Sequence, residues 1–352
     1  MILFLLACSA PEINGQWLSA DLHLHSSLGS NDTDGLGDAA ALAAVMEQQG
    51  LDLVWLTDHS NALGSMACED VEDCPNQGPE TTPGDWGDGV YLGVELSPRA
   101  EGSTPVGHVG CLPLDGEPFA QDVVFTDRPF GALDGAETLA QCAAAGGWSV
   151  VNHPESPFSW LAWDDSSDDY QAMEIYNGTL GFDTSDADAV ALWEARWQAG
   201  HKVVPVGGSD SHRWGSEPTE RGLDPAPGWP STRIFVREGQ DALQALHAGQ
   251  VIVFEPGSSL SFTANHDGDV VGPGEAISGP VTLSAQASAQ VSGLQLEIRS
   301  MDGDSLFVGP LGLESVVEDI GPGAYYARIW PDGEVLAQQG GVAISGVIEV
   351  LP

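Results

Sequence analysis

The segment LSADLHLHSS, residues 18–27, decides the fold class of this chain and contains its first candidate site residues. Apolar and polar residues alternate from Leu18 to Leu24, which is typical of a β-strand. Side chains two positions apart lie on the same side of an extended backbone, so His23 and His25 should point the same way. Two imidazoles in this arrangement can bind one metal ion or two adjacent ions, and neutral imidazole suits Zn²⁺, Mn²⁺ or Fe²⁺.

Helical and strand-like patterns alternate after this strand, up to about residue 255. The first helix is predicted over residues 37–49, where Gly50 stands at the position of a helix C-terminal glycine. Further helices are predicted over 134–146 and 184–199, and further strands over 51–57, 90–96, 106–112, 148–151, 173–176 and 203–206. This alternation predicts an α/β fold with a mostly parallel sheet and right-handed crossovers, which can close into a barrel.

The pattern changes at about residue 256. Short alternating stretches such as LQLEI, residues 294–298, are separated by glycine, proline and Asp-Gly. They predict a small all-β, sandwich-like domain over residues 256–352. This segment contains one histidine, His266, and no cysteine, so we expect the chemistry to lie in residues 18–255.

The charge balance excludes one class of function. Ten lysines and arginines face 52 aspartates and glutamates, which gives a formal net charge of −42. Affinity for phosphate backbones comes from clustered cations, so nucleic-acid binding by a basic patch is excluded. Lys202 is the only lysine, which leaves one candidate for lysine-based catalysis.

The first eight residues, MILFLLAC, indicate the end of a secretory signal. Leu5-Leu6-Ala7-Cys8 resembles a bacterial lipobox, in which Cys8 is the lipidated first residue of the mature protein. The apolar run is too short to span a bilayer, which needs about 20 residues. We therefore expect an exported lipoprotein, periplasmic or on the cell surface, with a linker over residues 9–17 and membrane contact only through this lipid.

The other four cysteines are an even set: Cys68, Cys74, Cys111 and Cys142. In an oxidising compartment this predicts two disulfides, for which three pairings exist. If Cys68 and Cys74 close the short acidic loop between them, the other two form the second bridge. The alternative is four unrelated thiols.

Six of the nine histidines fall in short polar clusters at the ends of predicted strands. The clusters are DLHLH (21–25), TDH (57–59), GVE (93–95), GH (107–108), NHP (152–154) and SDSH (209–212). The carboxyl ends of parallel strands converge on one face, so the clusters should meet there. Asp210 and His212 have the same two-residue spacing as His23 and His25, which predicts side chains on one side of an extended backbone. One buried histidine is usually an ordinary core residue, but this set predicts a metal centre.

Residues 18–255 resemble the PHP (polymerase and histidinol phosphatase) superfamily, and within it the CehA/McbA-like metallohydrolases. The resemblance is carried by seven motifs in order: DLHLHSS, WLTDHS, GVELS, GHVGCLPL, VNHPES, MEIYNG and GGSDSH. It implies a distorted (β/α)₇ barrel with two to three divalent metal ions. The C-terminal β segment is similar to the extension seen in many such proteins.

The resemblance also implies the metal ligands. For the first metal they are His23, His25, Glu95 and Asp210. For the second they are the bridging Glu95, His108 and His153. For the third they are His59, His212 and an acidic residue from the loop after His25. That loop is longer than the common Ser-Asp-Gly of the family, and Asp32 is our first choice, with Asp34 second. Asp58 is expected to orient the neighbouring cluster rather than to bind metal.

We therefore expect a metal-dependent hydrolase, first of all a phosphoesterase, in which a metal-bridging hydroxide attacks the substrate. The residues expected to carry catalysis are Glu95, His153, Asp210 and Asp58. Candidate substrate residues are Glu174, Asn177 and Arg213. Glu174 and Asn177 match a family position near the active site, although ordinary turn chemistry explains them equally well. Arg213 directly follows His212 and is a candidate for phosphate or carboxylate, or a plain surface arginine.

Two alternatives remain open. The same hydroxide attacks a carbonyl, so the substrate class includes carboxylic esters, carbamates and amides besides phosphate esters. In either case the expected partner is a small molecule, and several dications can hold an anionic one inside an acidic protein. The second alternative is an anchored binding protein, in which the metal site is structural and the β-domain is the working surface.

Overall fold

The protein is described here by a computed structural model. It describes residues 13–27, 29–30, 33, 36–59, 86–100, 104–119, 133–158, 162–163, 167–178, 181–214, 225–333 and 340–352. The lipobox with Cys8, the cysteines Cys68 and Cys74, and the alternative ligands Asp32 and Asp34 lie outside the described residues.

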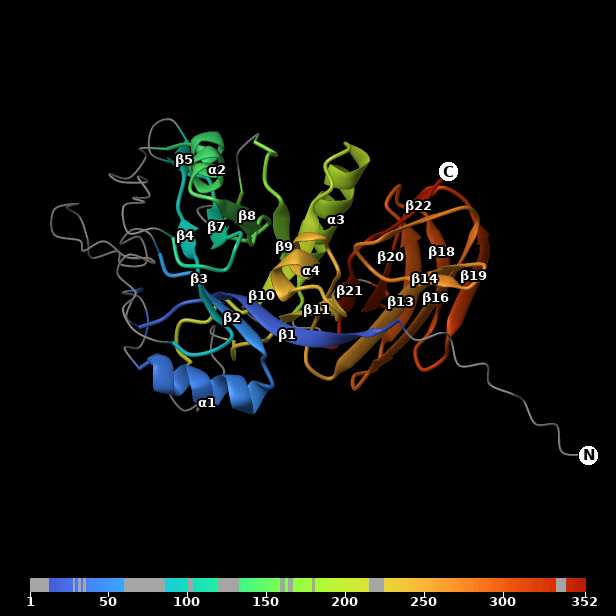
Figure 1. The fold of residues 1–352 in the computed structure, drawn as a ribbon, viewed down its shortest axis with the longest axis horizontal. Helices are drawn as coiled ribbons and strands as arrows, with labels where there is room; N and C mark the ends of the chain where they lie inside the picture. Colours follow the sequence, from blue (N-terminus) through green and yellow to red (C-terminus); the bar gives the residue numbers. More distant parts are fainter. Residues whose placement is uncertain are drawn as a thin grey trace, which may run out of the picture.

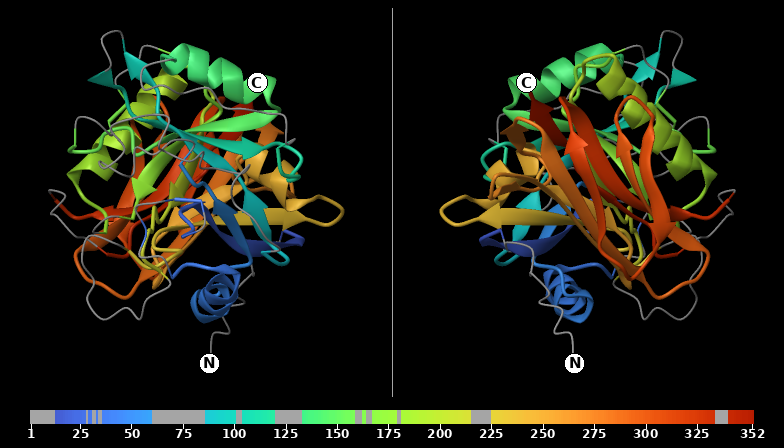
Figure 2. Two further views of the ribbon diagram at one scale, coloured as in Figure 1. Left: turned by 90° about the vertical axis from the view of Figure 1, so that its left-hand side faces the viewer. Right: turned by 90° about the vertical axis from the view of Figure 1, so that its right-hand side faces the viewer.

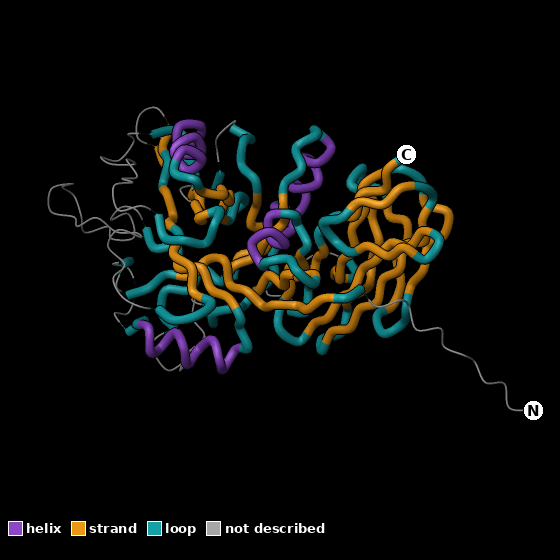
Figure 3. Tube along the Cα trace, viewed as in Figure 1, coloured by secondary structure: helices purple, strands orange, loops and turns teal. Residues whose placement is uncertain are grey.

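The described residues form a mixed α/β protein in which strands outnumber helices (Figures 1 and 3). The helices are α1 (Ala39–Gln49), α2 (Gly135–Ala144), α3 (Thr184–Gln198) and α4 (Ala242–His247). The strands up to residue 255 are β1 (Gly15–Leu24), β2 (Leu53–Leu56), β3 (Val90–Leu92), β4 (Val94–Leu96), β5 (Arg99–Ala100), β6 (Thr104–Pro105), β7 (His108–Pro113), β8 (Gly147–Asn152), β9 (Ala172–Asn177), β10 (Val204–Gly208), β11 (Ser231–Arg237) and β12 (Val251–Phe254).

The remaining strands lie in the C-terminal part: β13 (Ser258–His266), β14 (Asp269–Val271), β15 (Ala276–Ser278), β16 (Val281–Ala289), β17 (Leu294–Ser300), β18 (Ser305–Pro310), β19 (Ser315–Ile320), β20 (Gly323–Pro331), β21 (Ala343–Ser345) and β22 (Ile348–Leu351). The all-β character predicted after residue 256 is therefore present. One sheet runs β14-β13-β16-β19, and the strands of the other continue through β21 and β12 into β11, β1, β2 and β3. A continuous sheet thus crosses the expected domain boundary at residues 255–256.

A second main sheet, β10-β9-β8-β7-β4, carries the other half of the site. The prediction of a mostly parallel sheet was wrong in part, because β7 is antiparallel to both β4 and β8, and β11 is antiparallel to β1. The short link between β4 and β7, in which β5 and β6 lie, leaves little room for the helical crossover that a parallel pair requires. Only four helices occur in the described residues, so the regular alternation of a (β/α)₇ barrel is not seen there.

The helices begin and end where the sequence supplies capping groups. The Asp38 side chain accepts the Ala41 N–H at the start of α1, and Gly50 ends this helix at φ 67°, a left-handed conformation that glycine adopts without a steric penalty. Asp134 and Asp183 each form a capping box at the start of α2 and α3. In both views of Figure 2, α1 lies on the opposite side of the strands from α2. None of the described helices is long and apolar enough to span a membrane.

Helix α3 packs the site-bearing sheet against the C-terminal strands. Trp193 is fully buried, donates its indole N–H to the Val203 carbonyl, and meets the Tyr326 ring edge-on at 5.1 Å. The Glu194 carboxylate accepts a hydrogen bond from Arg299 of β17 at 3.0 Å. One apolar core therefore includes side chains from both regions.

Cys111 of β7 and Cys142 of α2 form a disulfide, which confirms the pairing expected if Cys68 and Cys74 pair with each other. Both cysteines are fully buried. Residue 147 has to be glycine for the disulfide to fit, because a Cβ there would lie 2.3 Å from the Cys111 sulfur. The bridge ties α2 to the strand that begins with His108.

Candidate metal centre

The ends of four strands meet at one place and carry most of the expected ligands. After β1, the His25 N–H donates to the Ser211 carbonyl, and the Asp210 N–H donates to the His23 carbonyl. After β2, the Glu95 N–H of β4 donates to the Asp58 carbonyl. Isolated bridges pair Leu24 with Ser211 and His59 with Glu95, and so join the two main sheets at this point.

The position of His108 differs from the sequence expectation, although it reaches the same place. It was expected near the carboxyl end of a parallel strand, but it is the first residue of β7. Because β7 is antiparallel to β8, its beginning lies beside the end of that strand, and His108 pairs with Asn152. His153 follows directly.

Glu95 is the centre of the cluster and is 1% exposed. Its two carboxylate oxygens lie 3.0–3.6 Å from ring nitrogens of five histidines: His23, His25, His59, His108 and His153. Asn152 also donates its side-chain N–H to Glu95 Oε1 at 2.9 Å. A carboxylate placed in this way can serve two metal positions at once.

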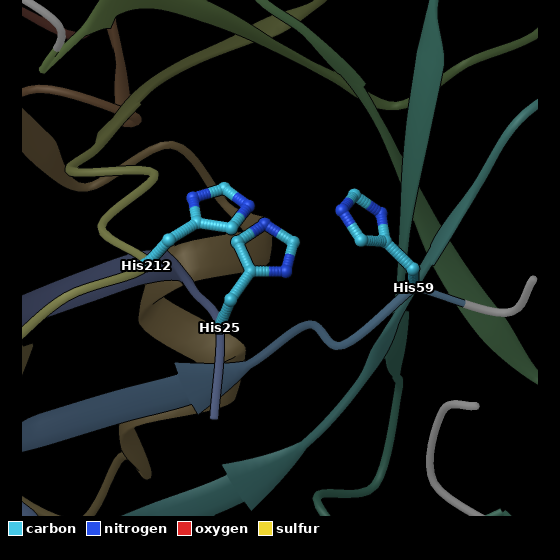
Figure 4. Close-up of side chains that lie close together, drawn as sticks. All are labelled: His25, His59 and His212. Carbon is cyan, nitrogen blue, oxygen red and sulfur yellow. The ribbon is translucent and has the colours of Figure 1, made fainter. Parts of the chain in front are cut away.

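The donor atoms form three groups, in each of which all atoms lie within 4.8 Å of one another. The groups are His23–His25–Glu95, Glu95–His108–His153 and His25–His59–His212. The first contains three of the four residues that the resemblance implies for the first metal, and the second is the set that it implies for the second metal. In the third, His25 stands with His59 and His212, and the imidazoles of His25 and His212 stack at 4.0 Å (Figure 4).

Asp210 lies beside two histidines of the first group, in a conformation that the sequence did not indicate. Its Oδ1 lies 3.2 Å from Nε2 of both His23 and His25. The expected extended backbone from Asp210 to His212 was wrong, because Asp210 has φ 55°. His153 has φ 31°, and positive φ is uncommon for residues other than glycine. Strained backbones of this kind cluster at functional sites.

A serine sets the tautomer of His25. Ser30 Oγ donates its one proton to Asp58 Oδ1 at 2.9 Å, so it can only accept from His25 Nδ1 at 3.1 Å. His25 therefore carries its proton on Nδ1 and turns an Nε2 lone pair toward Asp210 and His23. Asp58 also accepts the Ser26 N–H at 2.6 Å. The orienting role of Asp58 stays a prediction, and these hydrogen bonds are the contacts through which it would act.

The candidate substrate residues occupy different surroundings. Glu174 is buried behind His23, with Oε1 3.3 Å from His23 Nδ1. Asn177 is also buried and donates to Glu174 Oε2 at 3.0 Å and to Asp210 Oδ2 at 3.3 Å. Arg213 is exposed beside His212.

The charges of the cluster separate its histidines into two kinds. Burial disfavours the charged form of His23, but the carboxylates of Asp210, Glu95 and Glu174 outweigh burial and raise its pKa well above the usual value. Burial likewise opposes a charge on His153, but the hydrogen bond with Glu95 and the nearby carboxylates of Asp210, Glu95 and Glu174 together outweigh burial and raise the pKa.

The other histidines with shifted values behave in the opposite way. Burial, helped by His212 and His59, lowers the pKa of His25 to about 3. Burial also lowers the pKa of His108. Burial alone would raise the pKa of Glu95 and Asp210, but the surrounding histidines hold both below their usual values.

The spacing of the first group fits a four-coordinate divalent ion. Tetrahedral ligands about 2.0–2.2 Å from zinc lie roughly 3.3–3.6 Å from one another. Here His23 Nε2 lies 3.1 Å from His25 Nε2 and 3.2 Å from both Glu95 Oε1 and Asp210 Oδ1. His25 turns a lone pair into this cluster and both carboxylates are ionised, so these atoms are available as ligands for a cation.

Four residues that are not among the predicted site residues also shape the site. They are Ser30, Asn152, Asp21 and Trp214. Asp21 accepts the Ser209 N–H at 3.0 Å and the Gly228 N–H at 2.7 Å, and Trp214 donates to the His25 carbonyl at 2.7 Å. Asp21 and Asn152 stand in the same short motifs as the histidines, so their place in the sequence could have indicated a role at the site. The contacts of Ser30 and Trp214 with His25 can be recognised only in the folded structure.

No protein-family model and no curated protein matches this chain. Solved structures that are similar to it include three bacterial proteins. A two-domain protein from Bacteroides vulgatus, containing a predicted PHP-like metal-dependent phosphoesterase, is 14% identical with a TM-score of 0.45, over 96% of this chain and 97% of that one. PsfC from Pseudomonas syringae is 19% identical with a TM-score of 0.42, over 67% and 90%.

The third, a proposed metal-dependent phosphoesterase from Bifidobacterium adolescentis, is 15% identical with a TM-score of 0.38, over 62% of this chain and 94% of that one. At these TM-scores, all below 0.5, the likenesses establish neither a family nor an activity for this chain. The function has to be inferred from the site itself.

Proposed function

We propose that this protein is a metal-dependent hydrolase of the PHP type, and a phosphoesterase in the first place. The observation that carries the proposal is the shared position of Glu95. It belongs both to the group with His23 and His25 and to the group with His108 and His153. A carboxylate between two sets of imidazoles is the arrangement that a pair of divalent ions requires.

Ions bound there would supply a hydroxide near neutral pH and positive charge for the oxyanion of the transition state. The chain's own residues prepare the site. Ser30 fixes the tautomer of His25, and Asn177 holds Asp210 by its outer oxygen. Glu95 is buried and ionised, so it can bridge without first losing a proton.

The substrate is proposed to approach from the side of Asp210 and His212. These side chains are 17% and 22% exposed, whereas Glu95 and His25 are at most 1% exposed. Arg213 directly follows His212 in the chain and is exposed. Its guanidinium would bind a phosphate better than a neutral carbonyl, which favours phosphoester substrates.

The test is turnover of a panel of phosphomonoesters, phosphodiesters, carboxylic esters and amides by metal-loaded protein. We expect turnover of phosphoesters, loss of turnover in Asp210→Ala, and a raised KM for Arg213→Gln. A preference for carbonyl substrates would replace the phosphoesterase proposal with the alternative hydrolase. No turnover on the whole panel would contradict both.

A distorted barrel is the proposed architecture around the site. The two isolated bridges join β1 to the segment after β10 and the segment after β2 to β4. Together with the pairings of β7, β8 and β9 they support a ring of strands around the cluster. An experimental structure with continuous pairing around this ring would support the proposal, and an open edge between β1 and β10 would contradict it.

We also propose that the protein is exported and anchored by a lipid on Cys8. The buried Cys111–Cys142 bridge supports export, because structural disulfides persist mainly in oxidising compartments. Labelling with a radioactive fatty acid tests the anchor. The label should be incorporated by the natural chain and lost in Cys8→Ala, and equal labelling of both would contradict the proposal.

A further inference from the structure

Glu174 touches two of the three donor groups from behind. Its Oε1 lies 3.3 Å from His23 Nδ1, and its Oε2 accepts the backbone N–H of His153 at 2.8 Å. His23 belongs to one metal group and His153 to another, and none of the three groups includes Glu174. The carboxylate is 2% exposed. It therefore lies where one side chain can control two metal positions.

The direction of these hydrogen bonds follows from chemistry. An ionised carboxylate only accepts, so His23 must donate from Nδ1 and keep Nε2 for the cluster. Nε2 is the atom that faces His25, Glu95 and Asp210. On the other side, His153 has φ 31°, and the hydrogen bond from its N–H to Glu174 holds the backbone in this uncommon conformation.

The surroundings of Glu174 leave it little freedom. Asn177 donates to its Oε2, and the Asn177 N–H is itself held by Asp186 at 3.0 Å, within the capping box of α3. Gly208 lies against the opposite side, where a Cβ would stand 2.9 Å from Glu174 Oε1 and 2.5 Å from His23 Cβ. The carboxylate is thus held on both sides.

We propose that Glu174 is a positioning residue that fixes the tautomer of His23 and the backbone of His153 together, and thereby couples the two metal positions that share Glu95. This inference rests on the proposed metal centre. It replaces the substrate-contact role that the sequence suggested for Glu174.

Replacing Glu174 by glutamine makes the two contacts incompatible. If the amide oxygen faces His153, the NH₂ faces His23 Nδ1, which must then accept, and the proton moves to Nε2, where it blocks the metal. If the oxygen faces His23, the NH₂ meets the His153 N–H, and that donor loses its partner. Either orientation damages one metal position. Glu174→Asp keeps the charge but is one methylene too short for both contacts.

The experiment is calorimetric titration of metal-free protein with Zn²⁺, together with Tm values for the metal-free and zinc-loaded forms. Glu255→Gln is the matched control, since Glu255 is a partly buried carboxylate that accepts from Tyr176 of the same strand but lies outside the donor groups. We expect the control to bind zinc as the natural chain does. Both Glu174 variants should bind it about 10- to 100-fold more weakly or lose one equivalent.

The zinc-induced rise in Tm should shrink in the Glu174 variants and persist in the control. Zinc binding equal to that of the natural chain in a folded Glu174 variant would overturn the inference. If Glu174→Gln does not fold, the zinc affinity of Glu174→Asp provides the test. Absence of zinc binding by the natural chain would instead refute the metal centre, so the two failures are distinguishable.

Discussion

Binding of divalent ions to the metal-free protein should release protons, and we expect most of them to come from His23 and His153. The pKa values of His23 and His153 are raised, so at about pH 6 both rings carry a proton in the metal-free protein. The pKa of His25 is lowered to about 3, so this ring is already neutral, and the lowered pKa of His108 makes this ring bind a proton less readily than His23 or His153. A metal binds only the deprotonated imidazole, so loading should release about two protons per chain from these residues.

The sign of the pH dependence follows directly. Raised pKa values mean that the protons of His23 and His153 are present at low pH and are lost as pH rises through those values. Proton release from the histidines should therefore fall with rising pH, and the apparent metal affinity should rise over the same range. The carboxylates of Glu95 and Asp210 contribute no protons, since the pKa of each lies below its usual value.

The assay is calorimetric titration with Zn²⁺ at about pH 6 in buffers of different ionisation enthalpy, from which the number of protons is obtained. His153→Ala and His108→Ala form a matched pair, because each removes one imidazole from the donor group Glu95–His108–His153. The raised pKa of His153 means that it carries more of a proton than His108, whose pKa is lowered. His153→Ala should therefore release fewer protons than His108→Ala, and equal release by the two variants would refute this account of the charges.

Three further outcomes are expected. The double variant Cys111→Ala/Cys142→Ala should lose about 3.5–4 kcal/mol of unfolding free energy, as expected for a bridge between residues 31 positions apart, and a loss below about 1 kcal/mol in denaturant titrations would speak against this. Ser30→Ala should weaken zinc binding about 10- to 100-fold, because His25 Nδ1 loses its acceptor. Asp58→Asn keeps an oxygen that accepts from Ser30, so it should weaken zinc binding less. A larger loss of affinity in Asp58→Asn than in Ser30→Ala, measured by calorimetry, would contradict the tautomer argument. Gly208→Ala should weaken zinc binding by about tenfold or more, since its Cβ would displace His23, and an unchanged affinity would show that His23 can move without cost.

Most of the elements near the site could be predicted from local sequence. The helix expected over 37–49 is Ala39–Gln49, and the one expected over 184–199 is Thr184–Gln198. Apolar spacing together with Asp38, Gly50 and Asp183 is sufficient for this, because helix ends depend on groups within a few residues.

The sheet directions could not be predicted in the same way. An apolar run such as 108–113 looks alike in parallel and antiparallel strands, and only the length of the connection from β4 to β7 argues against a crossover. The convergence of the histidine clusters was nevertheless predicted correctly. An antiparallel strand with its histidine at the beginning brings that side chain to the same edge as a parallel strand with its histidine at the end.

The contacts that set tautomers and backbone strain were beyond sequence reasoning. Ser30 reaches His25 only because the chain turns back after β1, and the positive φ of Asp210 arises where the segment after β10 meets the end of β1. Glu174 could be recognised as a site residue by its motif. Its position behind His23, rather than in front of it, depends on the packing of β9 beside β10.

Metal content tests the central claim most directly. Protein purified without chelator or nickel affinity resin is analysed for Zn, Mn and Fe by plasma mass spectrometry, before and after reconstitution. We expect two to three equivalents per chain, in line with the three donor groups around Glu95 and His25. Less than one equivalent after reconstitution would mean that these histidines do not form a working metal centre.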